Sequence, residues 1–324
     1  MDIVYACDDK YAMLAGVSIE SLYASSKDID ELNVYILVNQ LSKENKSRLC
    51  CISNTYHREI IFVEFIEHEL CGTLNIDAQF WSVAAFARLF TPLLLPKLHK
   101  ILYLDCDIMV LHSLKELLQL DLNSSPCAAV SEPFSVLHRR NIGMSSDDVY
   151  YNSGIMLIDL DIWRKEDILK DFLACIERHN GRVPYVDQGV INEVFRGRIA
   201  TLPAKYNVST IYFDFSYEEA ERYRAAKNEY PKSEVEAAKK SPAIVHFNSS
   251  FLTPRPWVEN STHPYAAQWE SCCARTPWHD VKKWPDQPGT SKLALRWIFR
   301  HTPRPVGVWV ARLVNSIIRP LLKR

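Results

Sequence analysis

The sequence contains little glycine: there are nine residues in 324, with neither a Gly-x-Gly-x-x-Gly motif nor a Gly-x-x-x-x-Gly-Lys loop. Glycine-rich loops hold phosphate groups through backbone N–H donors that approach the ligand closely. Their absence excludes the two common nucleotide sites that depend on such a loop. A nucleotide bound by this chain would need side chains and a metal ion to hold its phosphates.

Cys-x-x-Cys pairs are also missing, although the chain contains nine cysteines. Cys7, Cys106 and Cys127 lie in or beside apolar strand-like runs, where a free thiol behaves as a small hydrophobic group. This usage favours a reducing compartment over a disulfide framework. No apolar run is long enough to span a bilayer, and Met1–Tyr5 is strand-like rather than the start of a signal peptide. These features predict a cytoplasmic protein.

Acidic residues are absent from 291–324, so the net charge of −1 is unevenly distributed. Eight of the 38 Lys and Arg residues lie in that segment, which leaves 30 basic residues against 39 acidic ones in the rest. The body is therefore mildly acidic and the C-terminal tail is strongly basic. An acidic body repels phosphates, which disfavours a nucleic-acid partner.

Apolar strand-like runs alternate with helix-like segments along the first part of the chain. Strands are predicted at 3–7, 34–38 and 60–66, and helices at 11–23 and after Ser42. This alternation predicts an α/β fold with a mostly parallel sheet flanked by helices. Ligands in such folds lie beyond the carboxyl ends of the strands, where this sequence places Asp8-Asp9.

The Asp105-Cys106-Asp107 triplet ends another apolar strand, 100–104. Taken alone, such a triplet is more often a strand-end turn than a site. Hard divalent cations such as Mg²⁺ and Mn²⁺ prefer oxygen ligands and bridge carboxylates to substrate phosphates. His246 ends a later strand, 243–247, and is either a structural histidine or a third ligand; an imidazole suits Mn²⁺ better than Mg²⁺.

Three further polar groups each have a structural and a functional interpretation. Arg88, in a helix predicted over 82–95, is either a surface salt bridge or a clamp for an oxyanion. Asn152-Ser153-Gly154 is predicted as a turn before the strand 155–160, although Asn152 can also bind a sugar hydroxyl. Asp187 is predicted as a helix N-cap, with Gln188 beside it as a polar candidate.

Together these motifs, in this order, resemble the retaining glycosyltransferases of family 8, which include bacterial lipopolysaccharide galactosyl- and glucosyltransferases and glycogenin. The resemblance covers 1–264. Each motif is weak alone, whereas six in the right order are highly specific. The motifs are Ala6-Cys7-Asp8-Asp9-Lys10-Tyr11, Phe86-Ala87-Arg88-Leu89, Leu102-Tyr103-Leu104-Asp105-Cys106-Asp107, Asn152-Ser153-Gly154, Val186-Asp187-Gln188, and His246-Phe247 followed by Arg255-Pro256-Trp257.

The resemblance implies a GT-A fold that binds UDP-galactose or UDP-glucose and Mn²⁺, with Mg²⁺ as an alternative. It implies Asp105, Asp107 and His246 as metal ligands, and Gln188 and Asp187 as catalytic residues. Tyr11 is expected to stack on uracil. The implied nucleotide-sugar contacts are Ala6, Asp8, Tyr11, Arg88, Asp105, Cys106, Asp107, Asn152, Ser153, Asp187, Gln188, His246, Ser249 and Arg255.

Two of these positions depart from the family pattern. Ser249 lies near the place of a common glycine, and Arg255 stands at the place of a lysine, in a lengthened loop. Arg255 keeps the charge but changes its geometry. The amide of Gln188, where a retaining glycosidase has a carboxylate, favours front-face attack by the acceptor over a double displacement.

Three other functions use similar residues. A haloacid-dehalogenase-like phosphatase would use Asp105 as its nucleophile, but that motif normally lies near the N-terminus, and its later Lys and acidic pair are not evident. A nucleotidyltransferase would need a glycine-rich motif. An inactive carbohydrate-binding homologue would not need a metal triad.

The tail completes the predicted organisation: a catalytic domain at 1–264, a linker at 265–290 and a basic amphipathic segment at 291–324. Lys292, Arg296 and Arg300 recur every four residues among aromatic and aliphatic ones, a pattern suited to an anionic membrane surface. The alternative is a helical hairpin packed on the domain. The membrane interpretation predicts a peripheral protein at the inner membrane face, acting on a lipid-linked saccharide in surface polysaccharide or lipopolysaccharide synthesis.

Overall fold

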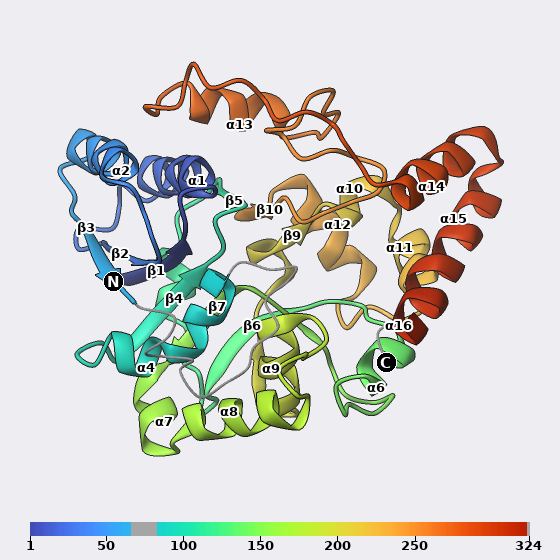
Figure 1. The fold of residues 1–324 in the computed structure, drawn as a ribbon, viewed down its shortest axis with the longest axis horizontal. Helices are drawn as coiled ribbons and strands as arrows, with labels where there is room; N and C mark the ends of the chain where they lie inside the picture. The colour runs from blue at the N-terminus through green and yellow to red at the C-terminus, as the bar shows by residue number, and fades with distance from the viewer. Residues whose placement is uncertain (66–82, 323–324) are drawn as a thin grey trace.

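The computed structural model describes residues 1–65 and 83–322 of the chain (Figure 1). The strands are β1 (Asp2–Cys7), β2 (Asn33–Val38), β3 (Ile60–Glu64), β4 (Lys100–Leu104), β5 (Ile108–Val110), β6 (Cys127–Ser131), β7 (Tyr151–Asp159), β8 (Ile199–Thr201), β9 (Val208–Ser209) and β10 (Ile244–His246). The helices are α1 (Ala12–Ser25), α2 (Lys43–Thr55), the 3-10 helix η1 (Val83–Phe90), α4 (Thr91–Leu94), α5 (Lys115–Leu118), α6 (Val136–Arg140), α7 (Leu160–Lys165), α8 (Ile168–Arg178), α9 (Val186–Val194), η2 (Ala204–Tyr206), α10 (Ile211–Asp214), α11 (Tyr217–Arg224), α12 (Lys232–Lys240), α13 (Ala266–Cys273), α14 (Thr290–His301), α15 (Arg304–Arg312), the π-helix η3 (Leu313–Ile318) and α16 (Arg319–Leu322).

The main sheet has seven strands in the order β3-β2-β1-β4-β7-β6-β8. Strands β1, β2, β3 and β4 are mutually parallel, and β8 is parallel to β6, whereas β7 runs antiparallel to both β4 and β6. The predicted α/β fold with a mostly parallel sheet is therefore confirmed. The antiparallel β7 places its beginning, not its end, beside the carboxyl end of β4.

Both faces of this sheet are buried, which explains why its strands are continuously apolar. Successive strand side chains point to opposite faces. Ile3 and Tyr5 join the core cluster that contains α1, and Val4 joins the cluster that contains α7, α8 and α9. Figure 1 shows the same arrangement, with α1 and α2 on one side of the sheet and α7 to α9 on the other.

The prediction of a turn at Asn152-Ser153-Gly154 is wrong, because these residues lie inside β7. Asn152 pairs with Val130, at a register shift between Ala129 and Val130. Gly154 is needed for space rather than for a turn: a Cβ there would lie 2.4 Å from His246 Cε1 and 2.7 Å from Asp105 Oδ2. Turn chemistry and close packing select the same residue, so the sequence alone does not separate them.

Two helix predictions also need correction. The segment predicted as one helix over 82–95 forms η1 followed by α4, and Ser82 lies outside the described residues. The N-cap of α9 is Tyr185, so Asp187 is not the cap but lies within the first turn. Because it does not cap the helix, the Asp187 carboxylate is available for a tertiary contact.

A second sheet of three strands, in the order β5-β10-β9, crosses the carboxyl end of the first. The predicted strand around His246 is β10, which runs antiparallel to β5 and parallel to β9. His246 pairs with Ile108, and Phe247 N donates to Asp107 O at 2.9 Å. This pairing brings His246 beside the Asp-x-Asp triplet across 139 residues of sequence.

The tail is a helical hairpin, in which α14 and α15 are separated at Thr302 and Pro303 (Figure 1). Leu295, Val308 and Ala311 are buried in the core cluster that contains α1. Arg304 Nη2 pairs with Glu219 Oε2 of α11 at 2.7 Å. The tail therefore packs on the rest of the protein, as the hairpin alternative predicts. None of the helices within 1–65 and 83–322 has the length and apolar character that crossing a bilayer requires.

Candidate active site

Asp105, Asp107 and His246 come together at the carboxyl end of β4. Their ligand atoms all lie within 4.8 Å of one another. His246 Nε2 is 3.2 Å from Asp107 Oδ1 and 3.8 Å from Asp105 Oδ2. The structure thus brings together the three residues predicted as metal ligands.

The residues around this cluster fit a divalent cation. Asn207 Oδ1 lies 3.0 Å from His246 Nδ1, and Asn207 donates its own amide to Asn152 Oδ1 at 2.8 Å. This contact holds the His246 ring with its Nε2 facing the two carboxylates. Two carboxylates and one imidazole form a donor set suited to Mn²⁺.

The charges of the cluster depend strongly on one another. Burial by itself would lower the pKa of His246, but the carboxylates of Asp107 and Asp105 outweigh it and raise that pKa above its usual value. Burial opposes ionisation of Asp107, yet His246 and Arg255 hold its pKa below the ordinary value. The carboxylates and the basic side chains of the site therefore stabilise one another's charged forms.

Arg88 connects this cluster to α9. Its Nη2 lies 2.6 Å from Asp105 Oδ1, and its Nε lies 2.9 Å from Asp187 Oδ2. The side chain is 4% exposed, so the interpretation of Arg88 as a surface salt bridge is wrong. Burial raises the pKa of Asp187 to about 6 even though Arg88 opposes the shift. Arg88 fixes Asp105 and Asp187 relative to each other.

The amide of Gln188 is held on both sides. Its Oε1 accepts from Ser153 N at 3.1 Å, and its Nε2 donates to the Tyr150 hydroxyl at 2.7 Å. Ser153 Oγ also donates to Asp187 Oδ2 at 3.2 Å. The predicted donor-sugar residues on β7 and α9 are therefore neighbours in one hydrogen-bonded group.

The backbone before α9 is strained. Tyr185 and Val186 have φ angles of 66° and 57°, a region that a β-branched residue such as Val rarely adopts. Such strain persists only where surrounding contacts over-determine it, and it clusters at functional sites. Here it turns the chain so that Asp187 and Gln188 enter α9 facing β7.

The residues predicted to hold the nucleotide lie at the end of β1. Asp8 Oδ1 accepts from Tyr11 N at 3.0 Å, and Cys106 Sγ donates to Ala6 O at 3.2 Å. Burial raises the pKa of Tyr11, although the nearby positive charge of Arg255 acts to lower it. Because the charges of Arg255 and Asp107 both act on it, the Tyr11 side chain lies close to the cluster. Asp9 instead accepts from Ser42 N at 2.7 Å and belongs to the start of α2.

Arg255 and Ser249 lie in the loop that follows β10. Arg255 Nη2 is 3.3 Å from Asp107 Oδ2, and its Nε donates to Phe247 O at 2.8 Å. Ser249 lines a neighbouring pocket together with Arg255. Arg255 thus contacts the cluster directly, and the expected diphosphate contacts of Arg255 and Ser249 stay predictions.

Several residues of the site were missed from the sequence. Asn207, which orients His246, comes from the irregular segment before β9 and carries no motif. Glu132 accepts from Asn152 Nδ2 at 3.1 Å and pairs with Arg224 of α11. Tyr150, whose hydroxyl accepts from Gln188, also lies outside the six motifs. The one local signal is that Glu132 directly follows the buried strand β6.

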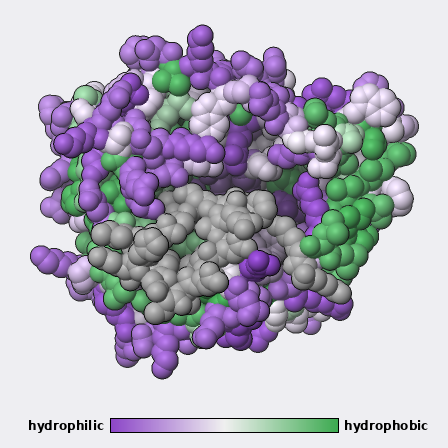
Figure 2. Space-filling view, viewed as in Figure 1, coloured by the Kyte–Doolittle hydropathy of each residue, from purple (hydrophilic) through white to green (hydrophobic). Residues whose placement is uncertain are grey.

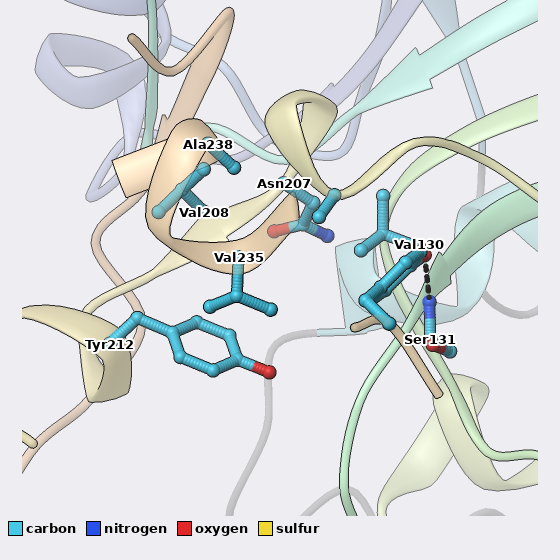
Figure 3. A pocket seen from close by; sticks show the side chains of 9 residues that line it. Val130, Ser131, Asn207, Val208, Tyr212, Val235 and Ala238 are labelled. Carbon is cyan, nitrogen blue, oxygen red and sulfur yellow. Dashed lines mark hydrogen bonds between the residues drawn. The ribbon is translucent and has the colours of Figure 1, made fainter. Parts of the chain in front are cut away.

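A cavity lies behind this site, enclosed by Val208, Val235 and Ala238 with the ring of Tyr212 (Figure 3). Its volume is about 10 Å³. That is the size of a single water, so the cavity cannot hold a sugar. The open cluster at the strand ends is the candidate active site.

The family model "Glycosyl transferase family 8" matches residues 2–261. The chain belongs to this family. It is therefore a hexosyltransferase, and the family 8 resemblance drawn from the six motifs is confirmed. The matched range contains every predicted site residue.

Individual relatives support this assignment. General stress protein A of Bacillus subtilis is 25% identical over 286 residues, which cover 87% of this chain and 96% of that protein. Lipopolysaccharide 1,2-glucosyltransferase of Escherichia coli K12 is 24% identical over 307 residues, covering 93% and 84%. The crystal structure of the galactosyltransferase LgtC with donor and acceptor sugar analogs has a TM-score of 0.68 at 25% identity, covering 86% and 96%. The predicted GT-A fold is thereby confirmed.

Proposed function

We propose that this enzyme transfers glucose or galactose from a UDP-sugar to a saccharide acceptor with retention of configuration and depends on Mn²⁺. The observation that carries the proposal is the cluster of Asp105, Asp107 and His246, joined through Arg88 to Asp187 and Gln188. A site for a metal and a site for a sugar then share one buried arginine. LgtC, whose structure contains donor and acceptor sugar analogs, has the same fold.

Asp105, Asp107 and His246 would hold the ion. A bound Mn²⁺ supplies Lewis-acid stabilisation of the charge that develops on the departing diphosphate. Arg255, 3.3 Å from Asp107, adds positive charge on the same side. The orientation of His246 through Asn207 keeps its Nε2 directed at the ion site.

Gln188 would position the donor sugar. Its amide is a poor nucleophile, and Asp187 beside it is held by Arg88 and Ser153. These contacts favour front-face attack, in which the acceptor hydroxyl approaches C1 from the side of the departing phosphate oxygen, which takes its proton.

The deciding experiment measures UDP release. UDP-glucose and UDP-galactose are incubated with the enzyme and Mn²⁺, with EDTA as the metal-free control and a generic phosphate ester as the comparator. We expect metal-dependent release of UDP from one of the two donors. Hydrolysis of the phosphate ester without UDP release would instead favour the phosphatase alternative with Asp105 as nucleophile.

We further propose that the acceptor is lipid-linked and that the C-terminal hairpin contacts an anionic membrane surface. The observation is a set of exposed apolar side chains on the hairpin, with Trp297 62% and Trp309 59% exposed. Figure 2 shows a green hydrophobic patch at the right of the molecule, on the side where Figure 1 places α14 and α15. Tryptophan and aliphatic side chains beside basic residues suit the membrane interface.

Only part of the basic pattern contributes to this surface. Arg296 is buried and pairs with Asp286, and Arg304 pairs with Glu219. Lys323 and Arg324 lie outside the described residues. The apolar face therefore supports membrane contact more strongly than the charge does. The relatives named lipopolysaccharide glucosyl- and galactosyltransferases are consistent with a lipid-linked acceptor.

A further inference from the structure

A polar pocket lies beside the active site, between the loop after β10 and the start of the hairpin. Its volume is about 190 Å³. Liquid water occupies about 30 Å³ per molecule, so this space is large enough for a ligand group rather than for one solvent molecule. Its lining includes Ser249, Thr253, Arg255, Asp286, Lys292 and Arg296.

Two of the three cations in this pocket already have partners. Arg296 Nη1 pairs with Asp286 Oδ2 at 2.7 Å, and its Nε donates to Phe251 O at 2.9 Å. Arg255 pairs with Asp107. Across the parts of the chain that the structure describes, the Lys292 ammonium makes no hydrogen bond or ion pair. The pocket therefore carries one positive charge with no ion-pair partner.

The surroundings of Lys292 raise the free energy of its charged form. Lys292 is half-buried, and burial together with the charges of Arg255, Arg319 and Arg296 lowers its pKa. Asp286 is the acidic side chain of the lining, and Arg296 already occupies it. A bound anion would neutralise the excess charge and fill the hydrogen-bonding capacity of the ammonium.

The chemistry of the lining favours a phosphoryl group. Ammonium, guanidinium and hydroxyl groups all donate hydrogen bonds to oxygen, and among the described residues no aromatic ring lines the pocket for a base or sugar to stack on. Several oxygens on one compact anion match several donors converging from different directions. A neutral saccharide would leave the Lys292 charge uncompensated.

The lining of the pocket is distinct from the metal-ligand cluster. Arg255 contacts Asp107 and is the link between the two, whereas the rest of the lining comes from 249–258 and 285–296 and includes none of the three predicted metal ligands. We propose that this pocket binds a phosphoryl group carried by the acceptor, an inference that rests on the proposed transferase function. The phosphoryl group belongs either to a lipid-linked acceptor or to a phosphorylated saccharide.

Inorganic phosphate is the probe for the first experiment. Its binding is measured by ³¹P NMR titration of the full chain with UDP and Mg²⁺ present at saturation, so that the donor site is filled. We expect Lys292→Gln to weaken phosphate binding about tenfold, the loss of one charge-assisted hydrogen bond. Lys292→Arg, which keeps the charge, should restore most of it. Lys282→Gln, at an exposed lysine of the preceding segment, should bind phosphate as the unaltered protein does.

Three results would overturn the proposal. Equal phosphate affinity in Lys292→Gln and Lys282→Gln would remove Lys292 from any anion site. Absence of phosphate binding when UDP is bound, or an equal loss of UDP affinity in Lys292→Gln, would assign the pocket to the donor diphosphate. Phosphate binding needs no sugar transfer, so failure of UDP-sugar turnover would count against the transferase proposal separately.

A second arm distinguishes the source of the phosphoryl group. Binding of Lys292→Gln and Lys282→Gln is compared on phosphatidylcholine vesicles with and without phosphatidic acid, and in solution with glucose 1-phosphate. A defect specific to Lys292→Gln on phosphatidic acid vesicles supports a lipid phosphate. A defect with glucose 1-phosphate alone supports a phosphorylated saccharide. No specific defect with either probe would contradict an acceptor phosphoryl site.

Discussion

The carboxyl end of the main sheet buries charged side chains, whereas the C-terminal hairpin exposes large apolar ones. At the sheet end, Arg88 is 4% exposed and contacts two carboxylates, and Gln188, Ser153 and Asn207 are hydrogen-bonded to neighbouring side chains. On the hairpin, Trp297 and Trp309 are more than half exposed and the protein leaves them uncovered. One region satisfies its groups internally, and the other leaves large apolar side chains at the surface.

This difference indicates what each region is built to meet. A buried, fully connected polar network fixes a geometry, because any partner that is lost leaves a buried group unsatisfied. An exposed apolar face gains free energy only when another surface covers it. Changes at the sheet end should therefore alter chemistry, and changes on the hairpin should alter location. The following predictions test that division, from the largest expected effect to the smallest.

The largest effect is expected from loss of a metal ligand. Asp107→Asn or His246→Ala should lower UDP-sugar turnover by about 10³-fold, because each removes one ligand from an ion that supplies several kcal/mol of transition-state stabilisation. Turnover is measured by UDP release, and circular dichroism checks that the fold persists. Asp28→Asn, at an exposed aspartate, is the control. Full activity of either ligand variant, or of the native enzyme in EDTA, would refute the metal site.

A smaller effect is expected at Gln188. Gln188→Ala should lower kcat by about 10²-fold with little change in UDP affinity, since its contact is made to the reacting sugar rather than to the nucleotide. UDP affinity is measured by titration alongside turnover. Gln119→Ala, at an exposed glutamine, should change neither quantity. If Gln188→Ala instead weakened UDP binding and kept its kcat, the proposed position of the sugar would be wrong.

Substitutions on the hairpin should weaken membrane binding without changing the hydrolysis of the donor. Trp297→Ser and Trp309→Ser should each reduce binding to phosphatidylglycerol vesicles by about tenfold, because each removes apolar surface worth ~1.4 kcal/mol at the interface. Sedimentation with vesicles measures this binding, and donor hydrolysis in solution should be unchanged. Val281→Ser, exposed but outside the hairpin, is the control. Unchanged sedimentation of the double tryptophan variant would remove the hairpin from membrane binding.

The last predicted effect changes neither chemistry nor location, and is a dependence of folding stability on pH. Burial lowers the pKa of His263 to about 4, so the folded protein keeps this ring neutral while the unfolded chain takes up a proton near the ordinary pKa of 6.5. The contribution of His263 to the free energy of unfolding is therefore complete above about pH 6.5. It falls by up to about 3 kcal/mol as the pH drops toward 4.

Urea unfolding of the native protein and His263→Gln between pH 7 and about pH 4.5 measures this effect. The variant should lose less stability on acidification than the native protein. His279→Gln, at an exposed histidine, should keep the native dependence on pH. Parallel curves for the native protein and His263→Gln would show that the ring is protonated in the folded state.

Much of the site was predictable because its residues follow strands. The run before Asp105 and the run ending at His246 are both apolar, so each predicts a strand that ends in a polar side chain. The meeting of the two ends depends on the antiparallel pairing of β10 with β5 in the second sheet. Arg88 was ambiguous, because nothing local distinguishes a buried arginine from a surface one. Asn207 and Glu132 were not predicted, since their roles arise from contacts across the sheet and carry no local pattern.

The sequence by itself determined the alternation of strands and helices, the positions of Asp105, Asp107 and His246 at strand ends, and the amphipathic tail with its break at Pro303. These features follow from periodicity, caps and proline, which act within a few residues. The tertiary structure decided that Asn152-Ser153-Gly154 is a strand rather than a turn, that Asp187 faces Arg88 instead of capping α9, and that the tail packs as a hairpin. Each of these depends on a neighbour distant in sequence, because packing space and buried charge are properties of the assembled fold.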